Sequence, residues 1–211
     1  MCSFCNIPYL RGGFSSRSIE SLVQDFSQLV ERGVSEINLL SQDTSSYGKD
    51  LRDGTELSGL LRALSTVPGD YWIRMFYCYP NSFTDEVLEV MASDPRFCRY
   101  LDMPFQHISD PVLKKMNRKI TRKEIEATMS MEIQQKIIRE HHQKMVGSLQ
   151  QVLVGGFSSE TDLLLEGRNQ YQGPEVDGVV YINEGNATSA GFHQVEITEA
   201  HEYDLVGKIL N

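Results

Sequence analysis

Apolar residues in the first part of the chain alternate between helical spacing and short continuous runs. From Ser18 to Arg32 they fall on one face of a helix, which Gly33 ends. The run over 34–40 is typical of a buried strand. The same alternation predicts helices over 56–65, 84–91 and 110–117, and strands over 71–79 and 99–105. Repeated strand–helix units predict an α/β fold with a parallel sheet, open or closed into a barrel.

The pattern changes after Thr121. The sequence is polar and helical as far as Met145, and short strands separated by turns follow. These strands are predicted over 149–154, 161–168, 176–182, 192–197 and 203–209. Five short strands in this length are typical of a small closed barrel of the OB type.

The two patterns predict three segments: an α/β part over 1–127, a connecting helix over 128–146 and a β-barrel over 147–211. Only three parallel strands precede the connecting helix. With all crossovers on one side, such a sheet leaves an edge exposed, so we expect the α/β part to be incomplete.

Composition narrows the class of protein. The chain has 211 residues, 40% of them hydrophobic, and four cysteines, which fits a globular protein rather than a disordered or disulfide-scaffold one. No apolar run approaches the roughly 20 residues that cross a bilayer, and the first residues do not resemble a secretory signal. We therefore expect a cytoplasmic protein without a membrane partner.

Negative charge is concentrated in the predicted barrel. Between Gly147 and Asn211 ten acidic residues stand against two basic ones, a formal charge of −8 out of −9 for the whole chain. Such a surface should repel the phosphates of nucleic acid and attract a basic protein. The alternative is an acidic surface that only keeps the protein soluble.

Cys2 and Cys5 form a C-x-x-C pair at the start of a loop, here called the cysteine loop (residues 2–6). By itself the pair is compatible with a redox site, half of a zinc site or an iron–sulfur ligand set. A redox pair prefers a helix N-terminus, and Pro8 is expected to break any helix here.

The surrounding residues carry a resemblance. Cys-Ser-Phe-Cys-Asn-Ile-Pro at residues 2–8, followed by Arg11-Gly12, is similar to the cluster loop of radical S-adenosylmethionine (SAM) methylthiotransferases. That family has C-x3-C-x2-C; Cys2 and Cys5 match the second and third cysteines, and the first falls before Met1. The segment 104–110 resembles a later strand end of the family, and the terminal barrel resembles a TRAM domain. The segments 41–44, 160–162 and 174–178 resemble the ribosomal-protein branch of the family.

The resemblance implies a partial radical SAM α/β barrel, similar to a TIM barrel, followed by an OB-like TRAM barrel. The implied cofactors are a [4Fe–4S] cluster and SAM, and the cluster needs an electron donor. The implied activity is radical methylthiolation of the β-carbon of an aspartate in small-subunit ribosomal protein twelve, a basic protein substrate. Direct binding of nucleic acid is not favoured.

Site residues follow from the same resemblance. Cys2 and Cys5 would bind the cluster. Gln42 and Asp43 follow the first strand and would hydrogen-bond the amino group of SAM, unless they serve only the turn there. Arg74, a charge in an apolar strand, would meet either the SAM carboxylate or a carboxylate of the barrel such as Asp102.

Gln106 and Ser109 follow the third strand and are expected at the same rim as cofactor-binding residues. His107 lies between them and has a structural role as its simpler explanation. Cys78 is expected to be a packed core thiol.

Two departures from the family pattern bear on activity. The domain that holds the family's second cluster has no counterpart, and about two strand–helix units are missing near residues 126–128. We therefore expect the chain by itself to be inactive. The alternatives are a tRNA adenosine methylthiotransferase and a non-catalytic remnant that docks on the ribosome.

Overall fold

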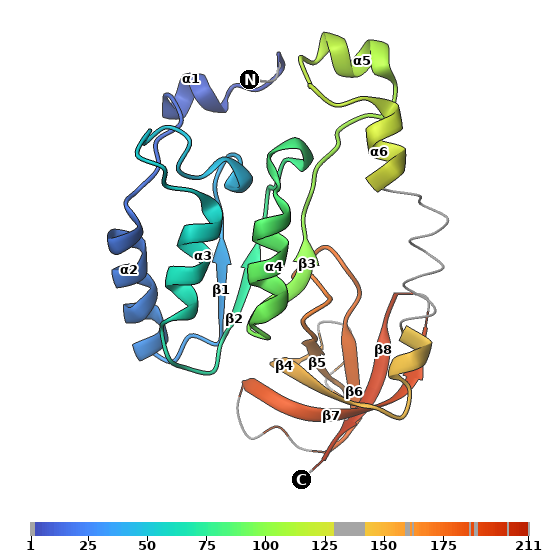
Figure 1. The fold of residues 1–211 in the computed structure, drawn as a ribbon. Helices are drawn as coiled ribbons and strands as arrows, with labels where there is room; N and C mark the ends of the chain where they lie inside the picture. The colour runs from blue at the N-terminus through green and yellow to red at the C-terminus, as the bar shows by residue number, and fades with distance from the viewer. Residues whose placement is uncertain are drawn as a thin grey trace. The chain divides into compact units, whose positions relative to one another are not determined.

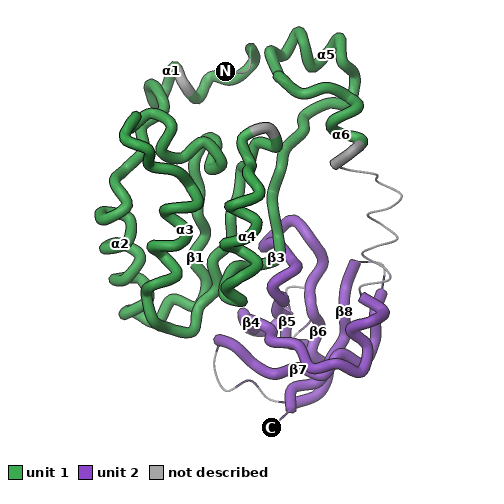
Figure 2. Tube along the Cα trace, in the orientation of Figure 1, with its two compact units in different colours: residues 1–129 green, residues 130–211 purple. Residues whose placement is uncertain are grey.

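The computed structural model divides the chain into two compact units, Met1–Met129 and Ser130–Asn211 (Figure 2). The structure describes residues 3–128, 142–158, 161, 163–185, 187, 190–201 and 203–210. Most of the connecting helix predicted over 128–146 lies outside these residues, although 142–145 are helical.

The first unit contains a parallel three-stranded sheet in the order β1-β2-β3. Its strands are β1 (Glu36–Leu39), β2 (Trp72–Met75) and β3 (Phe97–Leu101). Helices α2 (Ile19–Glu31), α3 (Leu57–Ser65) and α4 (Asp85–Ser93) lie over the same face of the sheet (Figure 1). The shorter helices are α1 (Ile7–Arg11), α5 (Asp110–Lys115) and α6 (Arg122–Thr128), with single 3-10 turns η1 (Thr44–Ser46) and η2 (Pro80–Ser82). The predicted α/β alternation is confirmed.

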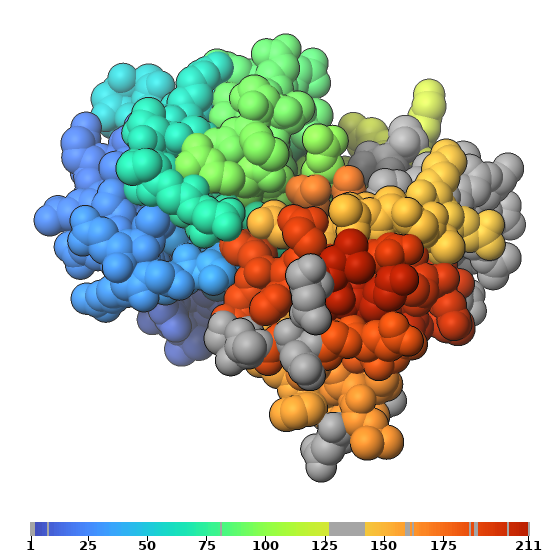
Figure 3. Space-filling view, turned by 90° about the horizontal axis from the view of Figure 1, so that it is seen from below, coloured from blue at the N-terminus to red at the C-terminus, as the bar shows by residue number. Residues whose placement is uncertain are grey.

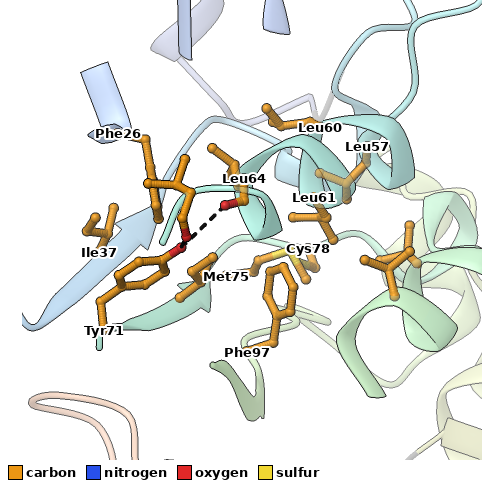
Figure 4. Packing of buried hydrophobic residues seen from close by; sticks show 14 residues of the cluster. Phe26, Ile37, Leu57, Leu60, Leu61, Leu64, Tyr71, Met75, Cys78 and Phe97 are labelled. Atoms are coloured by element: carbon orange, nitrogen blue, oxygen red, sulfur yellow. Dashed lines mark hydrogen bonds between the residues drawn. The ribbon is translucent and has the colours of Figure 1, made fainter. Parts of the chain in front are cut away.

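The core of the first unit lies between the helices and the sheet. Leucines of α3 point toward Met75 and Phe97 of the strands, and Phe26 of α2 packs edge-on against Tyr71 at 5.1 Å between ring centroids (Figure 4). The Tyr71 hydroxyl donates to the carbonyls of Leu64 and Val67, so its polar end is satisfied inside the core.

Two local predictions were wrong. The third strand begins at Phe97 rather than Arg99, so Cys98 lies inside it and is fully buried. A short helix, α1, forms across Pro8, where the sequence was expected to break one. A proline is tolerated in the first turn of a helix because the N–H it lacks has no intrahelical acceptor there.

The second unit is a closed five-stranded barrel in the order β4-β5-β6-β8-β7, as predicted from the spacing of its strands. The strands are β4 (Leu149–Phe157), β5 (Leu165–Arg168), β6 (Val180–Glu184), β7 (Gly191–Ala200) and β8 (Leu205–Ile209). Alternate residues fill the interior, among them Val152, Val195 and Leu205, which are fully buried. In the space-filling view the atoms coloured orange to red belong to this barrel (Figure 3).

Among the described residues, no helix combines the length and the apolar character needed to cross a bilayer.

Candidate functional site

One cavity lies where the three parallel strands end. It has a volume of about 530 Å³, and residues that follow each strand line it. Gln42 and Asp43 come after β1, Cys78 after β2 and Pro104 after β3, while Cys5 belongs to the cysteine loop. Ligand sites of parallel α/β folds lie at this end of the sheet, so the cavity is the candidate site.

The loop after β1 is fastened to the loop after β2. Thr44 donates through its amide to the carbonyl of Tyr77 (3.0 Å) and through its hydroxyl to the carbonyl of Phe76 (2.6 Å). The Ser45 hydroxyl accepts from the amide of Tyr79 (2.8 Å). Thr44 and Ser45 are both buried, so these bonds are shielded from water.

Asp102 fastens the loop after β2 to the end of β3. Its carboxylate accepts from the amide of Tyr77 (2.9 Å), and its carbonyl accepts from the amide of Cys78 (2.9 Å). Tyr77 has a φ of 56°, a left-handed conformation that an L-residue rarely adopts and that these bonds hold in place. The three strand-end loops therefore form one connected rim.

Gln42 and Asp43 are on the cavity wall, as the sequence predicted for the first strand-end loop. The Asp43 carboxylate also accepts from the hydroxyls of Ser45 (2.5 Å) and Ser46 (2.6 Å), which close the η1 turn. Asp43 therefore makes the hydrogen bonds that a turn-forming role requires. Binding of SAM by Gln42 and Asp43 stays a prediction.

The cysteine loop is held by the C-terminal end of α5. Ser3 donates through its amide to the carbonyl of Met116 (3.0 Å) and through its hydroxyl to that of Lys115 (2.8 Å). Carbonyls at a helix end have no intrahelical donor, so these bonds also satisfy α5. Cys5, partly buried, lines the cavity, whereas Cys2 lies outside the described residues.

The segment that follows α1 is fixed at Ser16. The Asp50 carboxylate accepts from both the amide (2.7 Å) and the hydroxyl (2.6 Å) of Ser16, and these bonds lower the pKa of Asp50. The amide of Gly48 donates to the same hydroxyl. Gly48 has a φ of 85°, and a Cβ there would lie 2.2 Å from the Thr55 carbonyl oxygen, so only glycine fits.

Cys78 is a buried thiol on the cavity wall. It packs in the core with Met75 and Phe97, as expected from the sequence, and it also lines the cavity. Burial is the main cause that raises the pKa of Cys78 to about 12, with Asp102 and Asp43 adding to the effect. The side chain is therefore a neutral thiol at physiological pH.

Arg74 is paired with Glu36 rather than with Asp102. Its Nε lies 2.9 Å from the Glu36 carboxylate, and the two side chains are 0% and 4% exposed. The guanidinium also lies over the ring of Tyr100, at 5.1 Å from its centroid. Arg74 is not among the residues that line the cavity.

Gln106 and Ser109 are not among the cavity-lining residues either. Gln106 is exposed with a φ of 71°. The amide of Ser109 donates to Nδ1 of His107 (2.9 Å), so His107 helps to start α5. The cofactor role of Gln106 and Ser109 stays a prediction, and of the residues after β3 the cavity instead includes Pro104.

Sequence reasoning missed Arg118 and Lys119, which bring positive charge to the cavity wall. They follow the end of α5 after Met116 and Asn117. The only local signal was Asn117, a residue type that ends helices in the left-handed conformation and so directs the next residues away from the helix axis.

A sequence profile of the radical SAM superfamily matches residues 1–147. The chain belongs to the radical SAM superfamily. A TRAM-domain profile matches residues 146–210, which contain the closed barrel. The superfamily and the domain order inferred from the cysteine loop and the strand pattern are therefore confirmed.

This radical SAM chain is similar to curated bacterial proteins named ribosomal protein uS12 methylthiotransferase RimO. It is 34% identical to the protein of Pelobacter propionicus over 99% of the chain and 63% of that relative, and 37% identical to that of Myxococcus xanthus over 99% of the chain and 59% of the relative. The protein of Bdellovibrio bacteriovorus is 35% identical, with 99% and 63% covered.

The chain thus spans about three fifths of the length of these relatives. The match to the Pelobacter propionicus protein runs over 282 positions, against 211 residues in the chain. The relative therefore has residues inside the matched stretch that have no counterpart here. This agrees with the missing strand–helix units expected from the sequence.

The cofactors of the RimO-type radical SAM relatives are a [4Fe–4S] cluster and SAM. Thiolates are the usual ligands of such clusters, and Cys5 on the cavity wall is of the required type. Within the described ranges, which exclude Cys2, no group of three or more His, Cys, Asp or Glu side chains is placed to hold a metal ion. The donor type therefore fits such a cluster.

Proposed function

We propose that the chain is the radical SAM and TRAM portion of a methylthiotransferase that modifies an aspartate of ribosomal protein uS12. The observation that carries the proposal is the position of Cys5, at a cavity where all three strands end, in a chain related to uS12 methylthiotransferases. A bound cluster would supply the electron that cleaves SAM. The chain's own residues bind and orient the ligands.

In this proposal Cys2 and Cys5 hold iron, and the bonds from Ser3 to the end of α5 fix the loop between them. Gln42 and Asp43 face the ligand from the loop after β1. The buried Cys78 thiol keeps water from the inner wall without offering a thiolate.

The acidic barrel supports a basic protein as the substrate. Glu175, Asp177, Glu184 and Glu199 are exposed. Of the two basic residues in this segment, Lys208 lies 3.3 Å from Glu196, which offsets its charge. A surface of this sign accelerates encounter with a basic partner and disfavours RNA.

Iron binding tests the cofactor part of the proposal. After anaerobic reconstitution with iron and sulfide, we expect Cys2→Ala and Cys5→Ala to lose most of the iron that the unsubstituted chain binds. Cys98→Ala, at a buried cysteine of β3 that does not line the cavity, is the matched control and should keep it. Equal iron in all four proteins would contradict the role of the cysteine loop.

Binding to purified uS12 tests the substrate part. We expect binding that weakens with added salt and with lysine substitutions at Glu175 and Glu199, because screening and charge reversal remove the attraction. Preferential binding of tRNA would favour the tRNA-modifying alternative. A third test uses the chain extended with the segments that its relatives have. If that protein binds ribosomal subunits but shows no SAM-dependent chemistry, the docking alternative is favoured.

A further inference from the structure

The cavity wall carries more positively than negatively charged side chains. Among the described residues that line it, Arg118 and Lys119 are cationic and Asp43 is anionic. The carboxylate of Asp43 accepts from two serine hydroxyls of its own turn. Positive charge therefore predominates on this wall.

Arg118 is placed by the way α5 ends. Asn117 takes a left-handed conformation with a φ of 55°. The amide of Asn117 donates to the carbonyl of Lys114 (3.1 Å), and the amide of Arg118 donates to that of Leu113 (2.8 Å). This pair of bonds is the Schellman arrangement, which fixes the backbone of the two residues after a helix.

The guanidinium of Arg118 is fixed as well. It lies over the ring of Tyr79 at 5.0 Å from the centroid, and one of its terminal nitrogens donates to the carbonyl of Pro104. Tyr79 and Pro104 belong to the loops after β2 and β3, so the rim of the cavity holds the side chain on two sides. A flexible surface arginine has no such restraints.

One donor of this fixed guanidinium has no acceptor among the residues that the structure describes. It is the Nε–H of Arg118, which is buried. A buried donor without an acceptor costs free energy, and a small shift of the side chain toward the cavity would let a ligand acceptor there remove that cost. Because adjacent guanidinium N–H groups match the two oxygens of a carboxylate, the acceptor that suits this side chain is a carboxylate.

We propose that Arg118 is a carboxylate-binding residue of the cavity, which positions a ligand relative to the cysteine loop. The inference rests on the proposed function, in which two ligands carry that group: SAM through its methionine part, and the protein substrate through its aspartate side chain. A guanidinium suits phosphates as well as carboxylates, and the carboxylate is favoured here because both ligands of the proposed function carry it.

The test compares pairs of ligands that differ by the carboxylate alone. After iron–sulfide reconstitution, the chain and its variants are titrated with SAM and with decarboxylated SAM. They are also titrated with uS12 and with uS12 whose acceptor aspartate is replaced by asparagine. The variants are Arg118→Gln, Arg118→Lys and, as a control with the same charge change at an exposed site outside the cavity, Arg32→Gln.

We expect Arg118→Gln to weaken binding of one carboxylate ligand at least tenfold and to leave its carboxylate-free partner unchanged. Arg118→Lys should lie between, because it keeps the charge and loses the planar fork. A change confined to the SAM pair identifies SAM as the source of the carboxylate, and one confined to the uS12 pair identifies the substrate.

The ratio within a pair separates positioning from folding, since a misfolded cavity weakens both members equally. The same ratios in Arg118→Gln as in the unsubstituted chain, for both pairs, would overturn the inference. The proposed function is tested separately, by the dependence of iron content on Cys2 and Cys5. Failure of one is therefore distinguishable from failure of the other.

Discussion

Replacing Arg74 with methionine should lower the free energy of unfolding of the first unit by about 3–5 kcal/mol. The Arg74 and Glu36 side chains are 0% and 4% exposed, and their Nε and Oε1 atoms are 2.9 Å apart. Methionine fills much of the arginine volume, so little of the loss comes from packing. The loss arises because the Glu36 carboxylate stays buried without its strongest partner.

The chain provides its own probe for this measurement. Trp72 is the single tryptophan, lies in β2 two residues from Arg74 and is 3% exposed. Its fluorescence during urea unfolding therefore reports on the first unit. The control is Arg62→Met, which breaks the exposed pair of Arg62 and Glu86 and should cost at most about 1 kcal/mol.

The double variant Arg74→Met with Glu36→Met separates the loss of the ion pair from the cost of the buried charge that is left behind. It should recover most of the loss, because two apolar side chains replace the ion pair without leaving a buried charge. A loss below about 1 kcal/mol for Arg74→Met alone, or a double variant no more stable than the single one, would refute the reasoning.

Three further predictions concern individual side chains. At pH 8 iodoacetamide should alkylate Cys78 roughly a thousandfold more slowly in the folded chain than in urea, because the pKa of about 12 in the folded chain leaves almost no thiolate. Mass spectrometry measures the two rates, and equal rates would contradict this prediction. The hydrogen bond from Arg96 lowers the pKa of Asp94 below 3.8. The bond's contribution to the free energy of unfolding, about 1.5–3 kcal/mol, should therefore be present above pH 3.8 and be lost as the pH falls through the lower pKa of the folded state. Asp94→Asn should flatten this part of an acid-unfolding profile. Ser3→Ala should speed hydrogen exchange in residues 3–11 about fivefold, the effect of losing roughly 1 kcal/mol, and unchanged exchange would show that the hydroxyl does not hold the loop.

The spacing of apolar residues predicted a helix or strand well where that spacing depends on the element itself and not on pairing with another one. The apolar face over 18–32 became α2, with Ser18 as its N-cap, because one stripe of side chains packs on the sheet. The start of β3 was misplaced because its register depends on pairing with β2, where Ile73 lies opposite Phe97. Pairing of this kind has no signal within the strand itself.

The candidate site was predicted in part for the same reason. Gln42 and Asp43 were placed at the rim because the end of a parallel strand is visible in the sequence. Arg118 was missed because its position depends on a helix ending and on the ring of Tyr79, which is 39 positions earlier in the chain. Contacts between loops far apart in the sequence follow from the tertiary fold.

The two faces of the three-stranded sheet explain why a charge is placed within an apolar strand. Ile37, Ile73 and Met75 belong to the core beneath the helices. Because side chains alternate along a strand, Arg74 belongs to the opposite face and meets Glu36 there. Apolar residues at both positions 36 and 74 would satisfy packing without burying charge, so the buried pair indicates a requirement other than packing.

That requirement is consistent with the position of the cavity. The sheet ends at a rim of hydrogen-bonded loops, and a ligand held there needs strands that do not slide against one another. The ion pair of Glu36 and Arg74 forms only in the observed register of β1 and β2, in which Glu36 lies opposite Trp72. A shift of one strand along the other would separate the charges. If so, the double apolar variant, although it recovers most of the stability, should bind SAM more weakly than Arg62→Met does. Equal affinity would show that the pair has no role in holding the rim.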